Sequence, residues 1–169
     1  EAPNEPRILA VLEKAAEVIP GKPITHLVNT HHHFDHSGGI RAAVSRSLTI
    51  VTHAANEAFY RRMAEQPSTI MSDALVRQPR GIKIEVFDDK LVHEDDSMTL
   101  ELHHIAGNQH SSSILMAYLP AQKIIIEADA YSPSPSRAQL FSPNMLENIQ
   151  RLGLDIDTIV PIHGLPVAW

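Results

Sequence analysis

The chain has 169 residues, the size of one domain with a buried core, so we expect a single domain over residues 1–169. Its formal net charge of −6 argues against non-specific binding to nucleic acid or to a membrane surface, because both favour a basic face. It contains no cysteine, which excludes disulfides, thiolate metal sites and cysteine nucleophiles.

The first half of the chain alternates helical and extended patterns. In order, the patterns predict a helix over 6–19, a strand over 24–29, a helix over 39–47, a strand over 48–52, a helix over 54–65 and a loop over 66–81 with a helical turn near 73–76. Phe59 and Met63 lie four residues apart on one helix face, so we expect both in the core. The alternation favours α/β layering.

The second half of the chain is mainly extended. Alternating residues predict strands over 82–87, 90–93, 98–105, 113–119 and 123–127, then a rigid polar loop at 132–136, a helix over 142–152 and a strand over 157–160. The turn at Asp88-Asp89 predicts that the first two of these strands form a hairpin. Ser142 is predicted to cap the helix, with Pro143 at its first position. The strands should form an antiparallel meander.

A histidine-rich loop, residues 29–39, lies between the first predicted strand and the next helix. It has the pattern His-x-His-x-Asp-His, with His31, His33, Asp35 and His36 within six positions. Side chains of an extended segment repeat their direction every second residue, so we expect His31, His33 and Asp35 to project to one side. The loop is internal and follows an apolar strand, unlike a purification tag. We therefore expect the chemistry here.

Neutral imidazole and carboxylate groups bind divalent metals, with zinc the default and iron, manganese or cobalt the competitors. A loop this short cannot place four ligands around one tetrahedral ion. We therefore expect two ions, with His31 and His33 on the first and Asp35 and His36 on the second. Each ion then needs further ligands from elsewhere in the chain.

Three residues lie shortly after predicted strands and are candidates for those ligands: His110, Asp129 and His163. Strand ends feed loops held by rigid elements, where binding residues commonly lie. The remaining histidines are weaker candidates. His26, His93 and His103 fall inside predicted strands, His32 has the wrong parity, and His53 or His104 could orient a ligand through a hydrogen bond.

In chain order, four segments resemble the motif set of the metallo-β-lactamase superfamily. They are His31-x-His33-x-Asp35-His36, Gly107-x-x-His110-Ser111, Glu127-Ala128-Asp129 and Pro161-Ile162-His163-Gly164. The resemblance covers residues 24–167 and departs at Asn108-Gln109, where many members carry Pro-Gly. It implies that His31, His33 and His110 bind one metal ion, that Asp35, His36 and His163 bind the other, and that Asp129 bridges both.

The resemblance also implies a fold class, α/β (α+β), as a partial αββα metallo-β-lactamase-like sandwich. In that fold several strands precede the first helix. The chain is therefore expected to be the C-terminal, larger part of such a domain, with the N-terminal strands absent. An uncovered sheet edge invites pairing with another chain, so a homo-oligomer through that edge is one expectation.

The activity implied by the resemblance is hydrolysis. Two zinc ions, or iron or manganese in their place, would lower the pKa of a bridging water, and the metal-bridging hydroxide would attack a small ester, thioester or lactone. Asp35 is the expected catalytic residue, because it would orient this hydroxide. Members that cleave β-lactams tend to carry Cys or Ser near the place of Asp129, so the resemblance disfavours that substrate.

Two other functions stay open. A mononuclear non-haem iron oxygenase on the same fold would need only two histidines and one carboxylate. The complete set of expected ligands weighs against it. An inactive fragment, which binds metal or forms oligomers without turnover, is the other alternative.

Overall fold

The computed structural model describes residues 1–134 and 139–169. It divides into two compact units, unit 1 (Glu1–Val86) and unit 2 (Phe87–Trp169), each with its own cluster of buried hydrophobic residues. The single domain stays a prediction. Part of the predicted loop at 132–136 lies outside the described residues. Among the described helices, none combines the length and the apolar character needed to cross a membrane.

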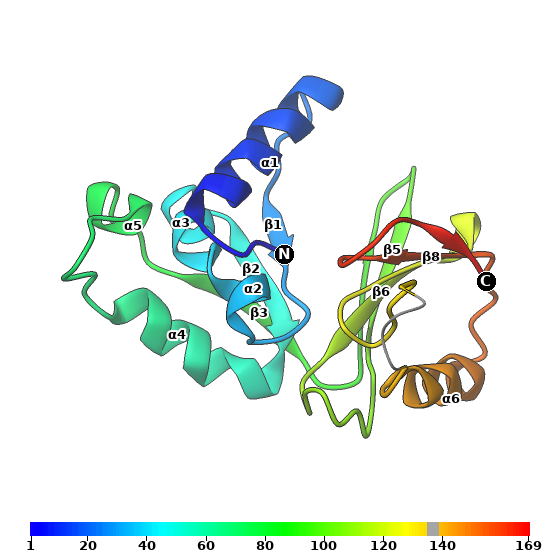
Figure 1. Cartoon of the computed structure of the whole chain (residues 1–169). Helices are drawn as coiled ribbons and strands as arrows, with labels where there is room; N and C mark the ends of the chain where they lie inside the picture. Colours follow the sequence, from blue (N-terminus) through cyan, green and yellow to red (C-terminus); the bar gives the residue numbers. More distant parts are fainter. Residues whose placement is uncertain (135–138) are drawn as a thin grey trace. The chain divides into compact units, whose positions relative to one another are not determined.

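Unit 1 places helices around a three-stranded sheet with the order β1-β2-β3 (Figure 1). Its elements are α1 (Glu5–Val18), β1 (His26–Val28), α2 (Phe34–Ser37), α3 (Ile40–Ser45), β2 (Thr49–His53), the 3-10 turn η1 (Ala54–Asn56), α4 (Glu57–Glu65), α5 (Ala74–Arg77) and β3 (Lys83–Phe87). β1 and β2 run parallel, with Leu27 opposite Ile50. A parallel pair requires a crossover connection, which here contains the histidine loop, α2 and α3.

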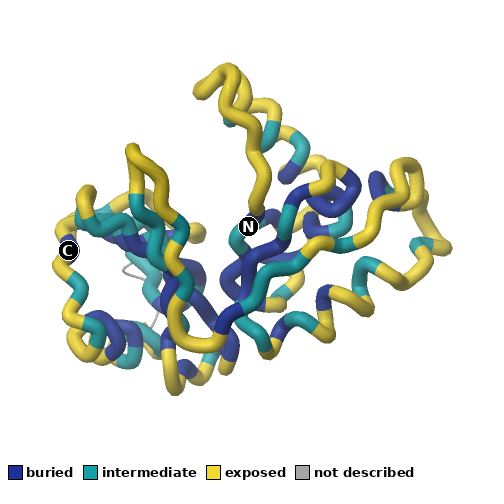
Figure 2. Tube along the Cα trace, turned by 180° about the vertical axis from the view of Figure 1, so that it is seen from behind, coloured by how far each residue is buried: buried dark blue, intermediate teal, exposed yellow. Residues whose placement is uncertain are grey.

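The first helix confirms the predicted one to within a residue or two. The side chain of Asn4 caps α1 by accepting a hydrogen bond from the backbone N–H of Arg7 at 3.0 Å, and Pro6 lies in the first turn. α1 is mostly exposed, as Figure 2 shows, and Ile8 is its buried residue. α1 ends before Pro20-Gly21, where Gly21 has a φ of +83°.

The core of unit 1 is built around α3, which contacts α1, α4, α5 and β2. Ala42 and Ala43 are buried and small, so neighbouring elements can approach α3 closely. Met63 packs against this core as predicted. The prediction for Phe59 was wrong, because Phe59 is 38% exposed and Tyr60 is the buried aromatic residue of α4. Packing of α4 against α3 determines which face of α4 is buried.

Unit 2 contains a six-stranded sheet with the order β4-β5-β6-β7-β8-β9. Its elements are β4 (Lys90–Glu94), β5 (Thr99–His104), β6 (Leu115–Leu119), the 3-10 turn η2 (Pro120–Gln122), β7 (Ile124–Glu127), α6 (Ser142–Leu152), β8 (Thr158–Pro161) and β9 (Val167–Ala168). β4 to β7 are antiparallel neighbours, which confirms the predicted meander. β8 runs parallel to β7 after the crossover through α6, whose Met145 and Ile149 pack into the core.

Two local predictions were wrong. The hairpin at Asp88-Asp89 does not form, because β3 belongs to the sheet of unit 1, whereas β4 pairs with β5 and places Leu91 opposite Leu102. Apolar pairing of β4 with the next strand along the chain outweighs the turn signal at Asp88-Asp89. α6 begins at Ser142 itself, whose hydroxyl donates to the carbonyl of Ala130 at 3.2 Å instead of capping the helix.

Candidate functional site

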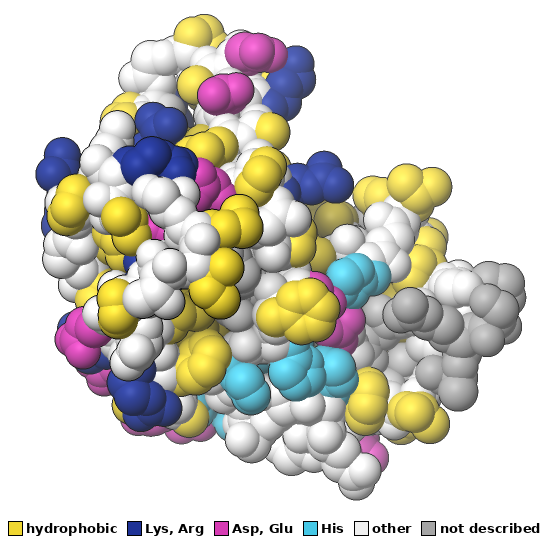
Figure 3. Space-filling model, turned by 60° about the vertical axis from the view of Figure 1, so that its left-hand side comes forward, with side chains coloured by type: hydrophobic (Ala, Val, Ile, Leu, Met, Phe, Trp, Pro, Cys, Tyr) yellow, Lys and Arg dark blue, Asp and Glu magenta, His cyan; other side chains and the backbone are white. Residues whose placement is uncertain are grey.

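The histidine loop leaves β1 in an extended conformation and turns helical after His33. His33 has φ −59° and ψ 147°, and its carbonyl accepts hydrogen bonds from the backbone N–H groups of His36 and Ser37 at 3.0 and 2.9 Å. The two-residue repeat of side-chain direction therefore ends at His33, and the prediction that Asp35 continues this repeat was wrong. The extended conformation gives way to the helical turn α2, because this turn buries His36 and Ser37. Figure 3 shows histidine side chains at the surface beside hydrophobic ones.

His31 and His33 form the first pair of candidate metal donors in unit 1. His31 is fully buried, and its Nδ1 lies 3.0 Å from the hydroxyl oxygen of Thr30. Its other nitrogen, Nε2, lies 3.0 Å from Nδ1 of His33. Two imidazole nitrogens that converge in this way suit one divalent ion, because the ring of His31 is already held from its far side.

Asp35 and His36 form the second pair. Nε2 of the fully buried His36 lies 3.3 Å from Oδ2 of Asp35. Nδ1 of the same ring lies 2.9 Å from Oε2 of Glu1. A carboxylate on Nδ1 favours the tautomer that carries its proton there, which leaves the Nε2 lone pair for a metal. This donor set also fits a metal ion.

Glu1 contacts the candidate site, and no sequence pattern predicted this role. Its Oε1 accepts a hydrogen bond from the backbone N–H of Thr30 at 2.8 Å, in addition to the contact with His36. Burial raises the pKa of this carboxyl, but the hydrogen bonds with His36 and Thr30 lower it below its usual value. Glu1 therefore contacts the histidine loop at two places, Thr30 and His36.

The two glycines at the end of the loop, Gly38 and Gly39, were the sequence signal for this contact. The backbone N–H of Gly39 donates to the carbonyl of Ala2 at 2.9 Å, and a Cβ at Gly38 would collide with the carbonyl oxygen of Pro3. Glycine permits such close backbone approach. The Gly38-Gly39 pair therefore indicates that a chain segment packs there, although it does not identify Glu1.

Asn29 and Tyr60 support the loop from the core. Asn29 is fully buried, and its Nδ2 donates to the carbonyl of His36 at 2.8 Å. The hydroxyl of Tyr60 donates to Oδ1 of Asn29. Burial raises the pKa of Tyr60, which therefore remains a neutral donor. The position of His36 thus depends on α4, which carries Tyr60.

His110, Asp129 and His163 converge in unit 2. Oδ2 of Asp129 lies 3.1 Å from Nε2 of His110, and Oδ1 lies 3.3 Å from Nε2 of His163. All three residues line a pocket of about 130 Å³. Each oxygen of Asp129 thus faces a different histidine, which is an arrangement that suits a carboxylate shared by two ions.

The turn that carries Asp129 is held by a buried carboxylate. Asp129 has a φ of +64°, in the left-handed region that costs energy for a residue with a Cβ. Oε2 of Glu127, which is fully buried, accepts hydrogen bonds from the N–H groups of Ala130 and Tyr131, both at 3.0 Å. These bonds fix the turn around Asp129. Glu127 is a second residue whose positioning role the sequence analysis did not predict.

Asn108, at the departure from the superfamily motif, anchors the loop before His110. Its Oδ1 accepts the backbone N–H of His110 at 2.9 Å, and its Nδ2 donates to Oδ1 of Asn144 on α6 at 3.1 Å. Asn108 is buried. Where many members carry Pro, Asn108 therefore fixes this loop by side-chain hydrogen bonds.

Four of the remaining histidines contact other groups. His26 is exposed beside Thr25, and the ring of His103 lies 2.7 Å from Glu101, with burial lowering its pKa. His53 caps η1 by accepting the N–H of Ala55 at 3.1 Å, and Nε2 of His104 lies 3.0 Å from the carbonyl of Ser112. Both of these contacts are with backbone groups, and the orienting role expected for His53 and His104 stays a prediction.

A family model described as the metallo-beta-lactamase superfamily matches residues 2–163. The chain belongs to this superfamily. No curated protein matches the chain. Members of this fold family bind metal ions, and the chain carries His and Asp side chains as candidate ligands. Superfamily membership supports a metal-dependent, hydrolase-type function.

Solved structures show the fold. A metallo-beta-lactamase from Pontibacter korlensis is 17% identical with a TM-score of 0.72, covering 99% of this chain and 74% of that one. The metallo-beta-lactamase FIM-1 from Pseudomonas aeruginosa, in its mono-zinc form, is 22% identical with a TM-score of 0.69, covering 99% and 70%. The flavodiiron protein from Giardia intestinalis is 16% identical with a TM-score of 0.71, covering 100% and 44%. The expected fold class is confirmed.

Proposed function

We propose that this chain binds two zinc ions and hydrolyses a small ester, thioester or lactone. The observation that carries the proposal is the arrangement of donors within each unit. In unit 1, the two members of each donor pair lie close together. Each pair contains a buried histidine whose Nδ1 contacts Thr30 in the first pair and Glu1 in the second. In unit 2, Asp129 offers one oxygen toward each of two histidines. An ion pair with a purely structural role would not require two such donor pairs or a carboxylate that faces two histidines.

The assignment of ligands follows the superfamily pattern. One ion would be bound by His31, His33 and His110, the other by Asp35, His36 and His163, and Asp129 would serve both. When bound, such ions supply an activated water and polarise the oxygen of the bond under attack. That the ligand sets of the two units serve the same ions is part of this proposal.

The protein residues contribute positioning. Asp35 would orient the attacking water by accepting a hydrogen bond at a carboxylate oxygen, which makes it the proposed catalytic residue. Glu1 would retain the proton on Nδ1 of His36, and Thr30 would set the ring plane of His31. These side chains are fixed before substrate arrives, so little reorganisation accompanies the reaction.

Metal content and turnover together test the proposal. After gel filtration, plasma mass spectrometry should find about two zinc ions per chain, and the zinc-loaded chain should hydrolyse p-nitrophenyl acetate, an acetyl thioester or a simple lactone. Asp35→Asn should reduce turnover strongly. His26→Ala, at an exposed histidine outside the donor pairs, should change neither measurement. A metal-loaded chain that cleaves none of the three substrate types would contradict the proposed activity.

An iron-dependent oxidoreductase is the second candidate. It is favoured by the similarity to flavodiiron proteins, which include rubredoxin:oxygen oxidoreductase from Desulfovibrio gigas. Imidazole and carboxylate donors suit iron as well as zinc. Iron in the purified chain, with oxygen consumption in the presence of a reductant and no ester turnover, would favour this candidate over the hydrolase.

A further inference from the structure

Unit 1 contains a hollow of about 520 Å³ that the proposed metal ligands do not line. It lies between α4 and the segment that follows it, and it is lined by Arg41, Phe59, Arg62, Met63, Gln66, Pro67, Ser68 and Asp73. Its volume falls within the range of small-molecule sites, which are commonly apolar with a few fixed polar groups. Phe59, Met63 and Pro67 supply apolar walls.

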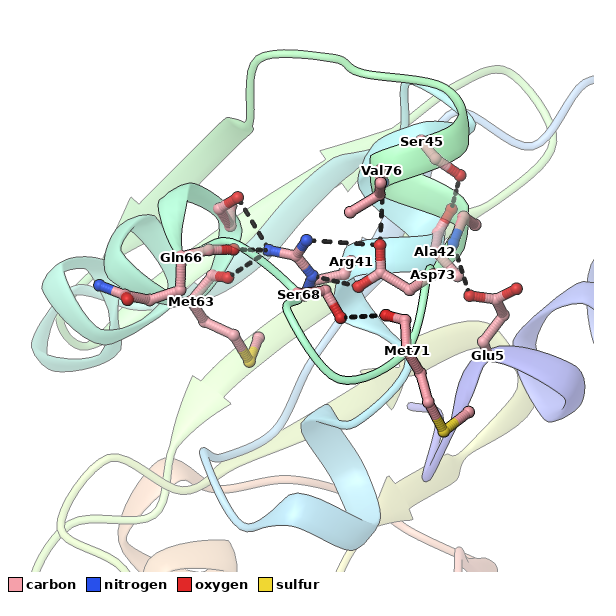
Figure 4. Close-up of polar contacts among 12 residues, drawn as sticks. Glu5, Arg41, Ala42, Ser45, Met63, Gln66, Ser68, Met71, Asp73 and Val76 are labelled. Carbon is pink, nitrogen blue, oxygen red and sulfur yellow. Dashed lines mark hydrogen bonds and ion pairs between the residues drawn. The ribbon is translucent and has the colours of Figure 1, made fainter.

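The base of the hollow is rigid because Arg41 is bonded in several directions (Figure 4). Its Nε donates to Asp73 at 2.5 Å, and one terminal nitrogen donates to the carbonyl oxygens of Met63, Ala64 and Gln66 at 2.8 to 3.0 Å. The hydrogen bond from Arg41 lowers the pKa of Asp73. The two opposite charges offset each other, and the segment after α4 is tied to α3.

Arg62 is the charged residue of the lining that this pair does not neutralise. Among the described residues, Arg62 forms no ion pair, whereas its neighbour Arg61 pairs with Glu57 at 2.6 Å. The lining therefore carries one net positive charge beside apolar walls. Such a combination complements an apolar molecule with one anionic group, and guanidinium is well suited to carboxylate.

The hollow adjoins the histidine loop through Phe59. The ring centroids of Phe59 and His32 lie 5.8 Å apart in an edge-to-face arrangement. The ring centroids of His32 and His33 lie 5.1 Å apart. Phe59 is partly exposed although it is a large aromatic residue, which leaves its ring available to a ligand. A molecule in the hollow would thus extend toward the first donor pair.

We propose that this hollow binds the apolar, carboxylate-bearing part of the substrate, with the carboxylate paired to Arg62 and the hydrocarbon lying against Phe59 and Met63. The assignment to a substrate rests on the proposed hydrolase function, because the bond to be cleaved would then reach the histidine loop. It narrows the substrate class to esters, thioesters or lactones whose acyl part ends in a carboxylate.

Calorimetric titration with octanoate and its neutral analogue octanamide tests the binding site without turnover. Octanoate should bind about fivefold more tightly than octanamide, since a partly exposed ion pair contributes up to roughly 1 kcal/mol. Arg62→Gln should abolish this difference, and the matched variant Arg61→Gln should preserve it. A difference that survives Arg62→Gln, or the absence of octanoate binding at millimolar concentration, would overturn the site.

Turnover separates the substrate assignment from the activity itself. The ratio of kcat/KM for mono-p-nitrophenyl suberate to that for p-nitrophenyl octanoate should fall about fivefold in Arg62→Gln and stay unchanged in Arg61→Gln. An unchanged ratio in Arg62→Gln would overturn the assignment although the hydrolase is active. If neither ester is cleaved while octanoate binding still depends on Arg62, the hydrolase proposal fails and the hollow remains a carboxylate site.

Discussion

Oε2 of Glu1 lies 2.9 Å from Nδ1 of His36, although 35 positions separate the two residues. The same carboxylate accepts the N–H of Thr30 through its other oxygen. The compact His-x-His-x-Asp-His pattern is therefore completed by a residue from outside the loop. The other ring nitrogen of His36, Nε2, faces Asp35.

Replacing Glu1 with Ala should weaken binding of the ion assigned to His36 about tenfold or more, because the ring loses the partner that sets its tautomer and plane. Competition between the chain and a fluorescent zinc chelator measures the affinity. Glu13→Ala, which removes an exposed carboxylate from α1, is the matched control for charge. Equal affinities in the two variants would refute the positioning role of Glu1.

His31→Ala and His110→Ala should each reduce the content of one metal ion more than the other, because both residues are assigned to the same ion. The double variant should then lose no more metal than either single variant. Elemental analysis of the purified variants provides the measurement. Two unchanged metal equivalents in His110→Ala, or additive losses in the double variant, would disprove the shared assignment.

Glu127→Ala should lower the free energy of unfolding by about 1–3 kcal/mol, since two backbone N–H groups at the turn around Asp129 would lose their acceptor. Glu127→Gln keeps an acceptor oxygen and should cost less. Urea unfolding of the metal-free chain gives both values. The ranking would be contradicted if Gln destabilised the chain as much as Ala.

Asp73→Asn should lower the free energy of unfolding by about 2 kcal/mol at pH 7, because Arg41 would lose its charged partner. The pKa of Asp73 is lowered in the folded state, so its contribution is present above the unfolded value of roughly 3.9 and is lost as the pH falls below it. The difference between wild type and Asp73→Asn should therefore shrink between pH 6 and pH 3.

Urea unfolding of the metal-free chain over this pH range checks the prediction. Asp96→Asn, at an exposed aspartate in a turn, is the control and should change stability little at any of these pH values. A difference between wild type and Asp73→Asn that stays constant down to pH 3 would show that the charge of Asp73 contributes nothing.

Several features could be predicted because they depend on neighbours in the chain. α1 follows from its apolar spacing, its proline and its glycine stop, and the meander from β4 to β7 follows from alternation. The convergence of His31 with His33 follows from the two-residue repeat of an extended loop. For Asp129, a place after a strand was predictable, but the positive φ that turns it toward two histidines was not.

The superfamily motifs, most of the elements and the side chains that could donate to a metal are readable from the chain, because spacing and chemical type are local properties. Three features emerge only from the folded chain: the contact of Glu1 with His36, the burial of Tyr60 rather than Phe59, and the separation of β3 and β4 into different sheets. Each of these depends on which distant surface is available for burial or hydrogen bonding, and no local pattern encodes that surface.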